Sequence, residues 1–143
     1  MKHPQLNTFW SEKIVRLLYK KGVAHACISP GSRNAPLVSA FLKYSKIKCF
    51  SHIDERSNAF FALGLTKKTS KPVVVLTTSG TATANLLPAV IEGYYTMNPL
   101  IVITADRPEK LINTGENQTI NQTNIFGNYV RKMENFNKRK SKG

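Results

Sequence analysis

Four short runs of apolar residues, rich in valine, isoleucine and leucine, recur along the chain, and each is followed by a polar turn. Such runs predict buried β-strands, here at Val23–Ser29, Ile47–Ile53, Pro72–Thr78 and Pro99–Ala105. The third run is continuous and largely β-branched, with no alternation of polar residues. That pattern is typical of a strand buried on both faces, as in a parallel sheet.

Segments with helical periodicity separate these strands. Helices are expected at Leu6–Lys21, at Ala35–Tyr44, from Glu55 to about Lys68, and from Ser79-Gly80-Thr81 through Ile91. The apolar face of the first is predicted to carry Trp10, Ile14, Leu17 and Leu18. Pro88 is expected to kink the last. Because strands and helices alternate, the sequence predicts a three-layer α/β fold with a doubly wound, mainly parallel sheet.

The length and a change in composition divide the chain into a domain and a tail. A chain of 143 residues suits one domain, which we place at residues 1–130. Residues 131–143 hold six lysines and arginines, one glutamate and no apolar periodicity. We expect this basic tail to be disordered, as a truncation, a frameshift or an artificial chain end would produce.

The charge and the apolar runs narrow the class of protein. The formal net charge of +13 favours anionic small molecules or permits contact with nucleic acid. The first ten residues lack the apolar core of a secretory signal, and no apolar run is long enough to span a bilayer. The expected location is therefore the cytoplasm, away from membranes. Cys27 and Cys49 lie in apolar runs, which favours two small buried side chains over a disulfide or a metal site.

Polar turns follow all four predicted strands. In an open parallel sheet, ligands bind outside the carboxyl ends of the strands, so these turns are expected to meet along one edge. They comprise Ser29–Asn34, Asp54–Asn58, Thr78–Asn85 and Asp106-Arg107-Pro108.

The chemistry of these turns suits a small anion. Arg33 and Arg107 carry guanidinium groups, which bind carboxylates through two parallel hydrogen bonds. The turn at Gly80 opens a helix whose N-terminus attracts polar ligands. Asp54 and Glu55 begin another helix, where either could be a cap and either could be a functional acid. Neither the Walker phosphate-binding pattern nor the glycine fingerprint of dinucleotide folds occurs.

Five motifs in register give the chain a family resemblance. The motifs are Ser29-Pro30-Gly31-Ser32-Arg33, His52-Ile53-Asp54-Glu55-Arg56, Thr78-Ser79-Gly80-Thr81-Ala82, Thr104-Ala105-Asp106-Arg107-Pro108 and Glu116-Asn117-Gln118-Thr119-Ile120. With them the chain resembles, over Leu6 to Val130, the N-terminal domain of the MenD family, the SEPHCHC synthases of menaquinone biosynthesis that use thiamine diphosphate.

The resemblance implies a pyrimidine-binding domain at residues 1–130. The complete enzyme would decarboxylate 2-oxoglutarate and add the succinyl carbanion equivalent to isochorismate. Glu55 matches the glutamate that hydrogen-bonds the aminopyrimidine ring of the cofactor and takes part in its activation. The turn beside that ring would comprise Ser79, Gly80, Thr81 and Asn85. The residues around isochorismate and the reacting centre would be Ser32, Arg33, Arg107, Asn117 and Gln118.

Two departures from the wider thiamine-diphosphate family qualify that resemblance. Thr81 and Ala82 replace a Pro-Gly pair that is common elsewhere in the family, which favours the MenD branch. The family's metal motif, a Gly-Asp-Gly followed by an asparagine pair, does not occur. Mg²⁺ (or Mn²⁺) would therefore be held by a separate diphosphate-binding domain, with no metal ligand in this chain. Because the family's sites form between subunits of a homo-oligomer, a dimer or a tetramer, the isolated chain is predicted to be inactive.

Two other functions stay open. One is a non-catalytic basic α/β module that binds acidic partners or nucleic acid through surface lysines. Its only support is the net charge, and the basic residues lack the interleaved aromatic residues that stack on bases, which disfavours nucleic acid. The other is the pyrimidine domain of a different thiamine-diphosphate decarboxylase or ligase.

Overall fold

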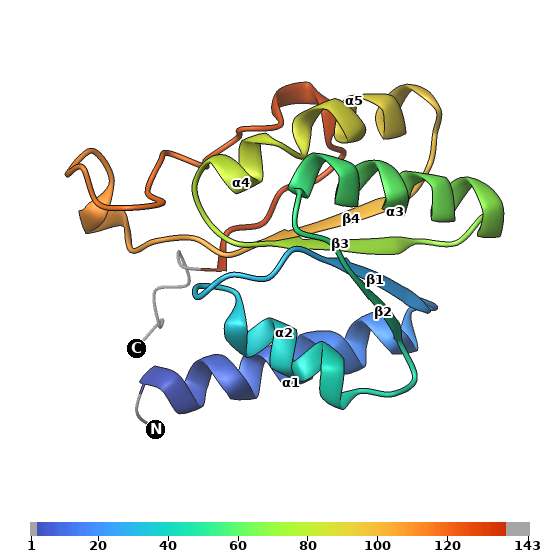
Figure 1. Ribbon diagram of the computed structural model, residues 1–143, viewed down its shortest axis with the longest axis horizontal. Coiled ribbons are helices and arrows are strands. Elements are labelled where there is room, and N and C mark those ends of the chain that lie inside the picture. Colours follow the sequence, from blue (N-terminus) through green and yellow to red (C-terminus); the bar gives the residue numbers. More distant parts are fainter. Residues whose placement is uncertain (1–2, 137–143) are drawn as a thin grey trace.

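The structure is a computed structural model that describes residues 3–136. Its four parallel strands are β1 (His25–Ile28), β2 (Lys48–Ser51), β3 (Val73–Thr77) and β4 (Leu100–Thr104). Helices α1 (His3–Lys20) and α2 (Ala35–Lys43) lie on one face of the sheet. Helices α3 (Glu55–Thr69), α4 (Thr81–Ala84) and α5 (Leu87–Tyr95) lie on the other (Figure 1). The predicted three-layer α/β fold is confirmed.

In the strand order β2-β1-β3-β4, the two central strands β1 and β3 are neighbours, so their carboxyl ends lie side by side. From β1 the chain crosses to β2 on one side and then returns to β3 on the other, so the direction of winding reverses between β1 and β3. At such a reversal the turns after neighbouring strands separate and leave a crevice at the carboxyl edge. The topology therefore places the ligand site expected at the carboxyl edge at the ends of β1 and β3. Two short 3₁₀ turns, Glu109–Leu111 and Gly127–Tyr129, follow β4.

The core is built on both faces of β3, all of whose residues are buried. Val74 and Leu76 pack with residues of α1 and α2, while Val73 and Val75 pack with residues of α3 and α5. Because side chains alternate along a strand, this continuous apolar run serves both layers. Its prediction as a doubly buried strand is confirmed.

Helix α1 buries a different face from the predicted one. Ser11 and Val15 are buried, whereas Trp10 is 51% exposed and Leu17 is 56% exposed. Residues spaced four apart share a helix face, so the buried stripe runs through Ser11 and Val15. Trp10 instead stands edge-on to Phe9, with ring centroids 5.6 Å apart. The predicted face was therefore wrong for Trp10 and Leu17, because the apolar residues of α1 extend beyond the stripe that the core covers.

Pro88 breaks the predicted helix into two. Helix α4 ends at Ala84 and α5 begins at Leu87, with Pro88 as its second residue. Proline has no backbone N–H to donate, and it is best tolerated in the first turn of a helix. Leu86, which lies between the two helices, is fully buried in the core.

The remaining local predictions fall as follows. Cys27 and Cys49 are both free thiols, as predicted, but only Cys27 is buried, while Cys49 is half-buried. Burial raises the pKa of Cys27 to about 12, and the neighbouring Cys49 adds to this rise. Within residues 3–136 no helix combines the length and the apolar character needed to cross a bilayer.

The first residues of the predicted tail, 131–136, are exposed, and Met133 Sδ accepts a hydrogen bond from the Asn124 N–H at 3.3 Å. The rest of the tail that we expect to be disordered, residues 137–143, lies outside the described residues.

Gly31 tests how closely the turn after β1 packs on the end of β3. A Cβ at Gly31 would lie 2.7 Å from Cβ of Thr78, which is too close for two carbon atoms. We expect Gly31→Ala to lower the free energy of unfolding by about 1–3 kcal/mol in urea titrations. The matched control is Gly64→Ala in α3, where nothing lies within 4 Å of the added Cβ. This control should gain about 0.5–1 kcal/mol from helix propensity, and an equal response of the two variants would contradict the steric argument.

Candidate functional site

The turn after β1 is held by Asn34, whose side chain is fully buried. Its amide donates to the Ser29 carbonyl oxygen at 3.0 Å and accepts from the Gly31 N–H at 2.8 Å. These two hydrogen bonds fix the backbone on either side of Pro30. The predicted site residues Ser32 and Arg33 project from this turn with exposed side chains.

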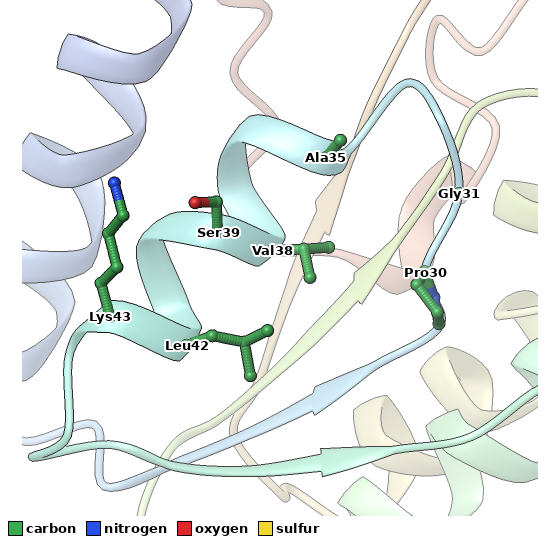
Figure 2. A pocket seen from close by; sticks show the side chains of 7 residues that line it. All are labelled: Pro30, Gly31, Ala35, Val38, Ser39, Leu42 and Lys43. Atoms are coloured by element: carbon green, nitrogen blue, oxygen red, sulfur yellow. The ribbon is translucent and has the colours of Figure 1, made fainter.

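A cavity of about 450 Å³ opens beside this turn. Figure 2 shows that its lining comes from the turn and from one side of α2. The lining residues are Pro30, Gly31, Ala35, Val38, Ser39, Leu42 and Lys43. None of the predicted site residues is among them, so the cavity adjoins the expected site without forming part of it.

The turn after β2 separates the two neighbouring acids. Asp54 is the N-cap of α3, and its carboxylate accepts the Ser57 N–H at 2.6 Å. The hydrogen bonds from Ser57 lower the pKa of Asp54 from its ordinary value of 3.8. Glu55 is the first residue of the helix and is half-buried, and its Oε2 accepts from the Asn85 amide at 3.2 Å. The question left open by the sequence is thus resolved, since Asp54 caps the helix and Glu55 does not.

The turn after β3 is closed over by a segment distant in the sequence. The Ser79 hydroxyl donates to the Gln118 carbonyl oxygen at 2.8 Å. Gly80 adopts a φ of +82°, and a Cβ there would lie 2.9 Å from Cα of Gln118. Only glycine adopts this positive φ without strain and, because it has no Cβ, lets the Gln118 backbone come so close. Thr81 begins α4 with an exposed side chain.

The turn after β4 is organised by Arg107, which is only 9% exposed. Its guanidinium donates to the Asn117 carbonyl oxygen at 3.0 Å and lies 3.5 Å from the Glu116 carboxylate. Arg107 therefore holds the segment that presents the exposed side chains of Asn117 and Gln118. Arg33, in contrast, has no ion pair within the part of the chain that the structure describes.

The structure brings some of the predicted site residues together and leaves others apart. Direct contacts join Glu55 to Asn85, Ser79 to Gln118, and Arg107 to Asn117. Ser32 and Arg33 lie in the same series of turns but form no hydrogen bond or ion pair with the other predicted residues within the part of the chain that the structure describes. Thr81 contacts Asn85 through the backbone alone, since its carbonyl oxygen accepts from the Asn85 N–H at 3.0 Å.

Gln122 is a residue that the sequence did not single out. Its side chain is 8% exposed, and its carbonyl oxygen accepts from the Gly80 N–H at 2.8 Å. Its amide nitrogen donates to the Ala105 carbonyl oxygen at 3.0 Å and lies 3.4 Å from the Thr104 hydroxyl. One side chain thus joins the turns after β3 and β4. Its position in a polar segment rich in Asn and Gln gave no signal of this role, whereas Asn34, directly before a helix, occupied a recognisable capping position.

A family model and a set of known proteins match the sequence of this chain. The model for the N-terminal TPP binding domain of thiamine pyrophosphate enzymes matches residues 10–125. The chain belongs to this family. The motifs on which the sequence resemblance rested therefore indicated the family correctly.

Several curated proteins that are similar to this chain are named 2-succinyl-5-enolpyruvyl-6-hydroxy-3-cyclohexene-1-carboxylate synthase. The protein from Haloarcula marismortui is 50% identical over 131 residues, which are 92% of this chain and 22% of the relative. The proteins from Roseiflexus castenholzii and Shewanella oneidensis are each 48% identical over 128 residues, 90% of this chain and 22% of the relative. The chain thus spans about a fifth of the length of the relatives it matches.

Membership of the thiamine pyrophosphate family implies that cofactor, and the turns offer groups that fit one end of it. The Glu55 carboxylate is half-buried and not used as a cap, so it is available to the ring nitrogen of an aminopyrimidine. Asn85 and the turn at Ser79 lie beside it on the same edge. For the metal, residues 3–136 contain no group of three or more His, Cys, Asp or Glu side chains close enough to hold an ion.

Asp54 provides a test of the cap and of its charge. Because hydrogen bonding lowers its folded pKa, its contribution to stability is present above its unfolded pKa and is lost as the pH falls through the folded value. Replacing it as Asp54→Ala should lower the urea midpoint at neutral pH, and the difference from wild type should shrink in acid. The control Asp54→Ser keeps a cap without a titrating charge. A wild-type advantage over Asp54→Ala that stays constant down to about pH 2 would contradict this assignment.

Gln122 provides a test of the link between turns. Gln122→Ala leaves the Gly80 N–H and the Ala105 carbonyl without their partner, and we expect a loss of about 1–3 kcal/mol in unfolding free energy. Gln122→Glu keeps the acceptor for Gly80 but can donate to Ala105 only when protonated. The stability deficit of Gln122→Glu should therefore become smaller as the pH is lowered. The exposed amide of Gln118 is the control, and Gln118→Ala should change stability by no more than about 0.5 kcal/mol.

Proposed function

We propose that this chain is the pyrimidine-binding part of a 2-succinyl-5-enolpyruvyl-6-hydroxy-3-cyclohexene-1-carboxylate synthase. Support comes from relatives of that name that match 90% or more of the chain at 48–50% identity. One observation carries the proposal. Glu55 lies at the carboxyl edge of the sheet and is not needed as a helix cap, because Asp54 caps α3. The activity would belong to the longer protein, and the isolated chain would be inactive.

The proposed role of Glu55 is to share a proton with the aminopyrimidine ring. The Asn85 amide donates to Oε2 and so fixes the carboxyl group by one oxygen, and Oε1 would be the oxygen available to the ring nitrogen. Ser79, Gly80 and Thr81 would form the adjoining wall. When bound, thiamine diphosphate supplies the electron sink for decarboxylation of a 2-oxo acid. The chain's own contribution is to orient the ring and to hold the proton at Glu55.

The proposed substrates, 2-oxoglutarate and isochorismate, are both dicarboxylates, which suits a chain of net charge +13. The exposed guanidinium of Arg33 would pair with a carboxylate, with Ser32 beside it. Arg107 already holds the Asn117 carbonyl, so its role would include positioning Asn117 and Gln118 as well as supplying charge. Mg²⁺ (or Mn²⁺) and the diphosphate would be bound by a separate domain, in a cytoplasmic homo-oligomer.

Catalytic dependence on Glu55 tests this proposal. Residues 1–130 would replace the corresponding segment of the Haloarcula marismortui relative, and product formation from 2-oxoglutarate and isochorismate would be measured. We expect turnover by the chimera and none by the isolated chain. In the chimera, Glu55→Gln should reduce kcat by about 10²–10⁴-fold, because proton sharing is lost, with the circular dichroism spectrum unchanged.

The matched control is Glu109→Gln, which removes an exposed carboxylate from the first 3₁₀ turn and should leave kcat unchanged. Near-normal activity of the Glu55→Gln chimera would show that another group activates the cofactor. Turnover by the isolated chain would contradict the proposal that a second domain completes the site.

A further inference from the structure

Three buried polar side chains under the first turn of α3 have no hydrogen-bonding partner within the described residues. Ser29 is 2% exposed, and Asn58 and Thr77 are fully buried. The Ser29 hydroxyl, the Thr77 hydroxyl and both polar atoms of the Asn58 amide are unpartnered. A polar group that leaves water without gaining a new hydrogen bond destabilises the folded state, so this set calls for a physical explanation.

The topology places these three side chains together. The parallel pairing of β1 and β3 runs from His25 opposite Val73 to Ile28 opposite Leu76, and the Ser29 N–H continues it by donating to the Leu76 carbonyl at 2.9 Å. Ser29 and Thr77 are thus neighbours at the ends of the two strands. Cys27 and Val75, two residues earlier on each strand, pack in the core on the α3 face. Alternation along the strands puts Ser29 and Thr77 on that same face.

Asn58 reaches this point from the helix. It is the first of the buried residues of α3, followed by Ala59 and Ala62, and α3 packs against both β1 and β3. Because α3 starts at the carboxyl edge, its first turn lies over the strand ends. Thr78 also has an unpartnered hydroxyl, but its side chain packs against Gly31, in a separate part of the edge.

We propose that Ser29, Asn58 and Thr77 bind one internal water molecule between α3 and the ends of β1 and β3. Two hydroxyls and a primary amide present both donors and acceptors, which matches the two donors and two acceptors of water. A cation fits poorly, because the three residues carry no charge and the N-terminus of α3 is the positive end of the helix dipole. The water joins the turn that carries Glu55 to the two central strands.

The direct test is magnetisation transfer from water to the side-chain amide of Asn58 in the ¹⁵N-labelled full chain. We expect a cross-peak with the sign of a long-lived bound water, whereas the exposed amide of Asn128 in the same spectrum should show only rapidly exchanging water. Absence of such a cross-peak at Asn58, in a chain whose other amides show a folded spectrum, would overturn the proposal.

Variants supply a second readout. Thr77→Val removes one partner of the water and should weaken or abolish the Asn58 cross-peak. Thr66→Val is the control, because Thr66 is equally buried on α3 but its hydroxyl already donates to the Leu63 carbonyl at 2.7 Å, and the cross-peak should persist. The triple replacement Ser29→Ala, Asn58→Leu and Thr77→Val should have a higher urea midpoint than Asn58→Leu alone, since no orphaned group remains. A triple variant with the lower midpoint, or an unchanged cross-peak in Thr77→Val, would contradict a shared water.

Discussion

The burial of β3 on both faces is the constraint from which the rest of the architecture follows. A strand with Val73 and Val75 on one side and Val74 and Leu76 on the other must be covered by two layers of helices. Helical crossovers between parallel strands supply those layers, and parallel strands bring all their carboxyl ends to one edge. The candidate site is therefore a consequence of the way the core is built, and its residues come from turns whose positions the core has already fixed.

At that edge, Asp54 and Glu55 divide two tasks between them: one caps the helix and the other is left for the ligand. A helix that starts beside a ligand needs its free N–H groups satisfied, and the ligand needs a carboxyl group within reach. Asp54 accepts the Ser57 N–H, and Glu55 is left to meet the Asn85 amide and the proposed cofactor ring. Arg107 has a positioning role at the same edge. Its guanidinium orders the backbone of the Glu116–Gln118 segment, which carries two candidate substrate-binding residues.

The sequence was sufficient for the parts of the structure that depend on neighbours along the chain. The four strands and the doubly wound fold followed from apolar periodicity, and the motif spacing indicated the family. The buried face of α1 did not follow, because apolar residues occupy more than one face of that helix and only packing decides between them. Nor did Gln122, since a glutamine that pairs with Gly80 across 42 positions looks, in the sequence, like any other polar residue of a loop.

That separation between Gly80 and Gln122 has a consequence for the order in which the molecule is completed during synthesis. All four strands and the five helices lie before residue 105, so the folded framework can form as soon as that length of chain is available. Until Gln122 follows, the N–H of Gly80 and the carbonyl of Ala105 lack their hydrogen-bonding partner. A ribosome-bound chain would thus pass through a stage in which the strands are paired but the turns after β3 and β4 are not yet joined.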